Sequence, residues 1–153
     1  MKPSWNVGDG YIDSIDFIPS KSIAIRGISL HRSYSGTNRF TGWIRLKEAS
    51  TKTVIATQSF AFTTDNSKTY FDRLFSTPTN VKTGIKYTIT LHYDGTWGVT
   101  DIWQGKGGQD TVFANYGEDS VKFQFIGSKD FDGEKNNGGG KDNGQIPRIL
   151  FSC

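Results

Sequence analysis

The feature that most constrains this chain is an alternation of apolar and polar residues with a period of two, which recurs in several segments. It is clearest over residues 85–92, where odd positions are apolar and even positions are polar. Such a pattern places alternate side chains on opposite faces of a β-strand. We therefore expect Thr88 and Thr90 to face water. The opposite face of this strand should be buried, with four apolar side chains: Ile85, Tyr87, Ile89 and Leu91.

Turn residues divide the chain into short segments of this kind. Ten candidate strands lie over 14–18, 23–30, 43–47, 54–62, 69–75, 85–92, 99–103, 111–115, 121–125 and 147–152. Segments rich in Gly, Asn, Asp and Ser separate them. Within 23–30 the alternation slips by one residue at Gly27, which predicts a β-bulge there. Because no window shows a helical apolar stripe, we expect an all-β fold, an antiparallel β-sandwich of roughly ten or eleven short strands.

Composition indicates one domain spanning residues 1–153 with its own core. Only 35% of the residues are hydrophobic, but aromatic residues make up 14% and bring large apolar surfaces. Cys153 is the single cysteine, so no disulfide can form within the chain. The chain shows neither a signal-peptide pattern nor an apolar stretch long enough for a membrane span. We expect a cytoplasmic protein that does not bind membranes. The net charge of +3 is scattered, so we expect no nucleic-acid partner.

Catalytic and metal-binding residues are sparse. The only histidines are His31 and His92, and we interpret both, together with Cys153, as polar surface residues. No arrangement of a nucleophile and a base is evident, so we expect the domain not to be an enzyme. Residues 130–134 begin like a calcium loop but depart from that pattern at the following positions, and zinc-ligand spacing is absent. We expect no metal ion and no cofactor.

Aromatic residues near predicted turns are the remaining candidates for binding. Trp97 lies among glycine-rich turn residues, Trp103 precedes another glycine-rich turn, and Tyr34 and Trp43 flank a third. Exposed aromatic rings stack on sugars or on the side chains of a partner protein, although they also fold back to cap the ends of a sandwich. A carbohydrate-binding module that uses Trp97 and Trp103 is therefore one hypothesis.

The end of the chain carries the most specific motif. An apolar strand over 121–125 enters a polar, glycine-rich insert that contains Asn136-Asn137-Gly138, and the chain leaves this insert through Gly144-Gln145-Ile146-Pro147. This order resembles the C-terminal signature of the PHR domain, found in the Pam/Highwire/RPM-1 ubiquitin ligases and in BTB-domain adaptor proteins. Segments 16–30, 42–48 and 81–88 resemble earlier strands of the same family, so the likeness covers nearly the whole chain.

This resemblance implies a β-sandwich without a catalytic site that acts as a protein-interaction module. Such domains occur in RING-type ubiquitin ligases and after BTB domains that bring substrates to cullin-3 ligases. By resemblance, this domain belongs to a larger multidomain chain, and its partner is a protein or a ubiquitination substrate. The glycines and Gln145 could equally serve only the backbone of the loop. The candidate partner-binding loops contain Trp97, Trp103, Asn136, Asn137, Gly138, Gly144, Gln145, Ile146 and Pro147.

Overall fold

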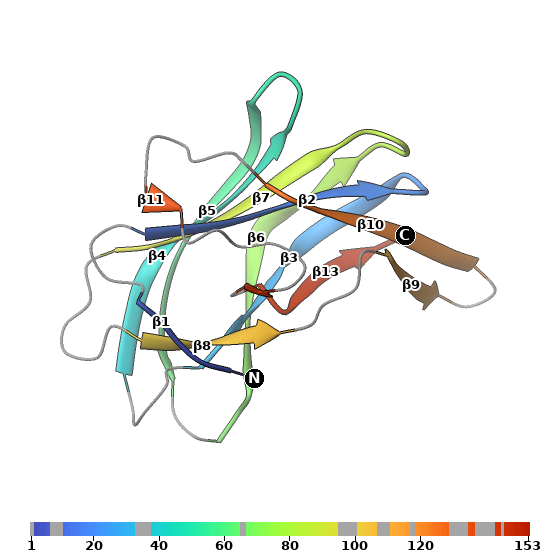
Figure 1. The fold of residues 1–153 in the computed structure, drawn as a ribbon. Coiled ribbons are helices and arrows are strands. Elements are labelled where there is room, and N and C mark those ends of the chain that lie inside the picture. The colour runs from blue at the N-terminus through green and yellow to red at the C-terminus, as the bar shows by residue number, and fades with distance from the viewer. Residues whose placement is uncertain are drawn as a thin grey trace.

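The computed structural model describes residues 2–6, 11–32, 38–64, 67–94, 101–106, 111–116, 119–128, 135–136, 143–144 and 146–153 (Figure 1). Regular structure in these ranges is entirely β-strand: β1 Lys2–Asn6, β2 Tyr11–Pro19, β3 Ile23–His31, β4 Asn38–Glu48, β5 Thr53–Thr64, β6 Tyr70–Val81, β7 Tyr87–Tyr93, β8 Asp101–Lys106, β9 Thr111–Tyr116, β10 Asp119–Gly127, β11 Lys135–Asn136, β12 Asn143–Gly144 and β13 Arg148–Ser152. Within these ranges, no helix is present that could cross a membrane.

Two main sheets form a sandwich. The larger sheet has the strand order β5-β4-β7-β2-β10-β9, and β11 joins it beside β2. The second sheet has the order β13-β3-β6, and a further small sheet has the order β1-β8-β12. Every pairing is antiparallel except that of β11 with β2. The predicted antiparallel β-sandwich is confirmed, although the sequence pattern does not predict β1, β11 or β12.

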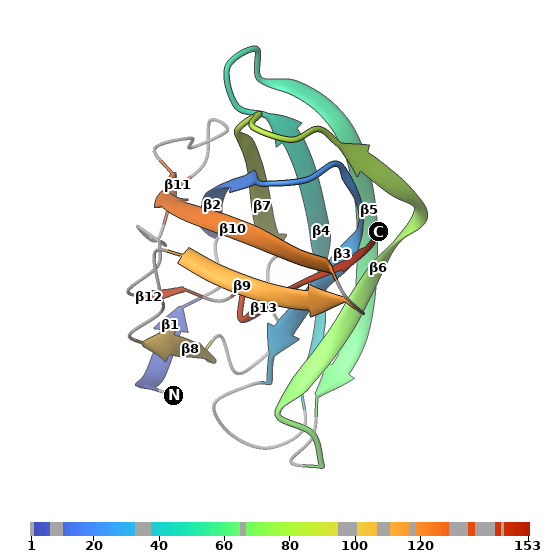
Figure 2. The same ribbon diagram turned by 90° about the vertical axis from the view of Figure 1, so that its right-hand side faces the viewer.

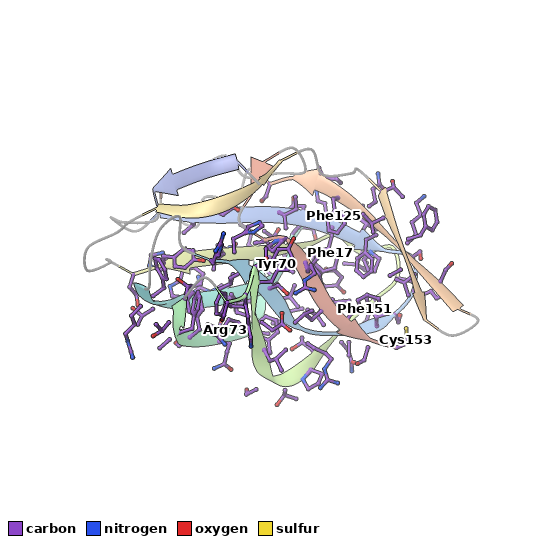
Figure 3. All side chains as sticks on the ribbon, turned by 90° about the horizontal axis from the view of Figure 1, so that it is seen from below. Phe17, Tyr70, Arg73, Phe125, Phe151 and Cys153 are labelled. Carbon is purple, nitrogen blue, oxygen red and sulfur yellow. The ribbon has the colours of Figure 1, made fainter. Side chains whose placement is uncertain are left out.

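Aromatic and aliphatic side chains fill the space between the two main sheets. Phe17 of β2 stacks on Tyr87 of β7, with 5.8 Å between ring centres, and lies 6.1 Å from Phe123 of β10. Phe123 in turn lies 5.0 Å from Phe151 of β13, which joins the larger sheet to the second one. Figure 3 shows Phe17, Phe125 and Phe151 between these strands. The aromatic residues therefore carry much of the core, as their abundance suggests.

The apolar face of β7 is largely as predicted. Tyr87, Ile89 and Leu91 are buried within the core. Ile85 is an exception, because it precedes β7 and is 36% exposed. The prediction that Ile85 is buried is therefore wrong.

The opposite face of β7 is also buried, so the prediction that Thr88 and Thr90 face water is wrong. Their exposed fractions are 1% and 0%. β7 is a central strand between β2 and β4, and polar partners on β2 satisfy its hydroxyls. The Thr88 hydroxyl donates to a carboxylate oxygen of Asp16 at 2.6 Å, and the Thr90 and Ser14 hydroxyls share a hydrogen bond of 3.0 Å. These bonds make a buried polar seam along the outer face of the sheet.

Two glycines allow close approach of neighbouring strands. The register of β3 against β6 shifts between Ile25 and Gly27, which confirms the predicted bulge. A Cβ atom at Gly27 would lie 2.1 Å from the carbonyl oxygen of Arg73. At Gly42 of β4 it would lie 2.0 Å from the carbonyl oxygen of His92. Both positions therefore require glycine for steric reasons.

Candidate partner-binding loops

Four short strands near the candidate loops gather on one side of the molecule. β1, β8, β11 and β12 lie on the left in Figure 2, away from the β5 and β6 side. Gly144 of β12 pairs with Gly105 of β8, and Trp103 precedes Gly105 by two residues on that strand. The structure therefore brings two of the predicted residues, Trp103 and Gly144, into neighbouring strands of the same small sheet.

The remaining residues of the insert are placed differently or lie outside the described ranges. Asn136 of β11 pairs with Ile12, so the first half of the insert joins the large sheet at β2. This differs from the second half, in which β12 pairs with β8. The predicted residues that fall outside the described part of the chain are Trp97, Asn137, Gly138 and Gln145, and the same is true of Tyr34 and of residues 130–134. A single binding site built from all these loops stays a prediction.

Ile146 and Pro147 connect the insert to the body of the sandwich. Both are partly buried, and Ile146 packs against the hydrophobic core. A partly buried apolar side chain that packs on the core at this point fixes where the insert ends. Ile146 thus anchors the chain between β12 and β13, whether or not it also touches a partner.

Arg148 makes a second anchor directly after this motif. Its Nε donates to the Ser29 hydroxyl at 3.1 Å, and that hydroxyl donates to a carboxylate oxygen of Asp72 at 2.6 Å. The Arg148 guanidinium also lies 3.6 Å from the same oxygen and 4.4 Å from the centre of the Tyr70 ring. These contacts link β13, β3 and β6. Arg148 is not among the predicted site residues, although its place immediately after Gln-Ile-Pro is a signal that could have found it.

His31 lies next to this group and is not a surface residue, so that interpretation is wrong. It is 2% exposed, and its ring centre lies 5.5 Å from that of Tyr70. Neither ring nitrogen has a hydrogen-bond partner among the described residues. Burial lowers the pKa of His31 to about 4. His31 is therefore a neutral, buried ring at neutral pH, because desolvation disfavours its charged form.

His92 and Trp43 form a second aromatic group, on the outer face of the large sheet. Trp43 lies within β4 rather than beside a loop, and its ring stacks on His92 with 4.9 Å between centres. The Arg45 guanidinium lies 4.0 Å from the centre of the Trp43 ring. The His92 side chain is 12% exposed, so His92 lies at the surface only in part. Cys153 is exposed, as predicted.

Chemical groups that could hold a metal ion do not cluster in the described ranges. No three His, Cys, Asp or Glu side chains approach one another there as a set of metal ligands would. What the described side chains offer is an apolar anchor at Ile146 and a polar clamp at Arg148. Both groups hold the end of the insert in place, which is a structural role.

Comparison with known proteins agrees with this architecture. The family model described as the PHR domain matches residues 1–152. BTB/POZ domain-containing protein 6 of Xenopus tropicalis is 32% identical over 149 residues, and its human counterpart is 31% identical. BTB/POZ domain-containing protein 3 of Homo sapiens is 28% identical. Each match covers 93% of this chain but only 24% or 25% of the relative, so the chain spans about a quarter of these relatives. The chain belongs to the PHR domain family.

Proposed function

We propose that this domain recognises a partner protein within a ubiquitin-ligase assembly and has no catalytic activity of its own. The observation that carries the proposal is the match of a PHR family model to residues 1–152. The similarity to BTB/POZ domain-containing proteins supports a place in a longer chain whose other domains connect it to the ligase. A cytoplasmic location is part of the same proposal.

Rigid support of loops is the mechanism that fits this architecture. The sandwich holds the short strands β8, β11 and β12 on one side of the molecule, and the Ile146 and Arg148 anchors fix the end of the insert. A specific protein interface needs on the order of 1,000 Å² of buried surface. One loop cannot supply this area, so we expect several of the candidate loops to contact the partner together.

Pull-down from cell extract with substituted domains tests this function. Asn137→Ala and Gln145→Ala should each reduce recovery of ubiquitin-pathway proteins or their substrates, with the melting temperature nearly unchanged. Asn80→Ala is a matched control, because it removes an exposed side-chain amide from β6, which lies away from β8, β11 and β12 in Figure 2. Undiminished recovery with both loop variants would contradict the proposed site.

Sugar binding is the outcome that would replace this proposal. A carbohydrate-binding module would bind glycans directly, and Trp97→Ala would remove much of the affinity through lost stacking. Specific binding on a glycan array that this change abolishes, with no protein partner recovered, would overturn the proposed function.

A further inference from the structure

Strand β9 is an edge of the large sheet in the part of the chain that the structure describes. Among the described residues it pairs with β10 alone, and Figure 2 shows it at the edge next to that strand. Its six residues are Thr-Val-Phe-Ala-Asn-Tyr, without a charge or a proline. Proteins usually protect exposed edges with charged residues, proline or bulges, because free backbone groups there attract another strand. None of these protective features is present in β9.

Both faces of β9 expose apolar side chains. Val112 pairs with Phe123, which is buried in the core, so Val112 faces the interior, and yet it is 37% exposed. Phe113 pairs with Lys122 on the outer face and is 65% exposed. A segment that packed on one face of β9 would leave the apolar side chain on the other face exposed. An additional strand beside β9 would cover both.

The backbone of β9 is oriented to accept such a strand. The amide and the carbonyl of Lys122 both bond to Ser20, on the β2 side of β10. In an antiparallel strand the N–H and C=O groups of one residue point to the same side, and this side alternates along the chain. Lys122 therefore does not bond to Phe113, its partner in the register. The N–H and C=O of Phe113 accordingly point away from β10, toward the open edge.

We propose that the occupant of this edge is a second copy of this chain, paired antiparallel through β9 about a two-fold axis at Phe113. In this register the two Phe113 residues face each other, and the N–H and C=O groups of each one bond to those of the other. Thr111 then faces Asn115 of the second copy, whose backbone points outward in the same phase. Shifting one copy of β9 along the other by two residues, in either direction, would keep the same faces together but would lose one hydrogen-bonded residue pair. The centred register is therefore the most favourable one.

Side chains and charges are compatible with this pairing. Val112 lies opposite Ala114 of the second copy, so a larger apolar residue meets a smaller one on the inner face. Among the residues of β9 and β10, the charges nearest the proposed axis are the two Lys122 side chains. Three strand spacings separate them, about 14 Å, which exceeds the Debye length of about 8 Å at physiological salt. An uncharged edge thus meets its copy without repulsion, whereas a charged segment of another protein would find no opposite charge on β9.

The area indicates a weak dimer. Pairing of two single strands falls at the low end of specific interfaces, below about 1,200 Å². We expect association that depends on concentration. The inference goes beyond partner recognition and does not depend on it, but a paired domain would present its loops twice and so increase the avidity for a repeated partner.

Cysteine cross-linking tests the register. In a Cys153→Ser background, Phe113→Cys should form a disulfide-linked dimer under mild oxidation, because facing residues lie about 5.5 Å apart at Cα, within the range that a disulfide spans. Thr111→Cys is the matched control on the same strand and face. Its two copies would lie more than about 13 Å apart, so it should not cross-link. Equal cross-linking of both variants would overturn the proposed register.

Sedimentation equilibrium of the unmodified chain tests the association itself. We expect a monomer–dimer equilibrium, and Phe113→Lys should raise the dissociation constant at least tenfold. Because Phe113 is largely exposed, this substitution should leave the melting temperature nearly unchanged, which separates lost pairing from lost folding. A chain that stays monomeric up to roughly 1 mM, a concentration at which binding of only about 4 kcal/mol is detected, would refute the proposal.

Discussion

The buried imidazole of His31 makes the stability of this fold depend on pH. Burial holds its pKa at about 4 in the folded protein, whereas an unfolded chain has a histidine pKa of about 6.5. Between these values the unfolded chain binds a proton that the folded chain does not bind. Stability contributed by the neutral ring is therefore complete above pH 6.5 and decreases as the pH is lowered toward 4.

The size of this effect follows from the two pKa values. A difference of about 2.5 pH units corresponds to a limit of about 3 kcal/mol. Lowering the pH from 7.5 to 5 covers most of this range and should cost about 2 kcal/mol in the free energy of unfolding. For a domain of 153 residues, this loss lowers the melting temperature by about 4–8 °C.

Urea titration at pH 7.5 and pH 5 measures this loss. His31→Phe is the informative variant, because it keeps an aromatic ring against Tyr70 and removes the titrating nitrogens. Other groups that titrate contribute to both proteins, so the comparison isolates His31. The free energy of unfolding should fall about 2 kcal/mol more in the parent protein than in the variant. An equal fall in both proteins would refute the reasoning, even if the variant is less stable at each pH.

The remaining predictions concern local packing, and chemical denaturation checks each of them. Gly27→Ala should cost about 3 kcal/mol or more, because its Cβ would overlap a backbone carbonyl, while Gly127→Ala, with open space around it, should change stability by less than about 0.5 kcal/mol. Ile89→Ala should cost roughly 2–5 kcal/mol through its cavity, and Ile85→Ala less than about 1 kcal/mol, so equal losses would contradict the observed faces of this segment. Thr88→Val should cost about 1–3 kcal/mol, because it leaves a buried carboxylate without its hydroxyl donor; an unchanged midpoint would show that the seam contributes little.

Period-two patterns predict this fold well where one face of a strand meets the core. They place Tyr87, Ile89 and Leu91 correctly, and the slip at Gly27 locates the bulge. They fail for Thr88, because polarity alone does not distinguish a side chain in water from one that is buried with a hydrogen-bond partner on a neighbouring strand. That distinction depends on which strands become neighbours, and a single strand does not carry this information.

A motif, rather than periodicity, identifies the candidate residues in and after the C-terminal insert. The motif identifies the residues around Gln145, but it does not reveal that Ile146 packs against the core or that Arg148 reaches β3 and β6. Ser29 and Asp72, which hold Arg148, lie far from it in the sequence. Contacts of this kind arise only after the second sheet has assembled, so local sequence patterns do not predict them.

The two tightly packed glycines also affect how genetic variants of this domain should be interpreted. Gly42 is flanked by a surface-facing aromatic residue, Trp43, yet a Cβ atom at Gly42 would overlap the backbone of His92. A missense change at Gly42 would lower the amount of folded protein in a cell, because unfolded chains are degraded. In a loss-of-function screen, such a change would give the same result as a change that disrupts a partner-binding site. Measuring the steady-state level of each variant protein therefore separates changes that prevent folding of the domain from changes that prevent binding of its partner.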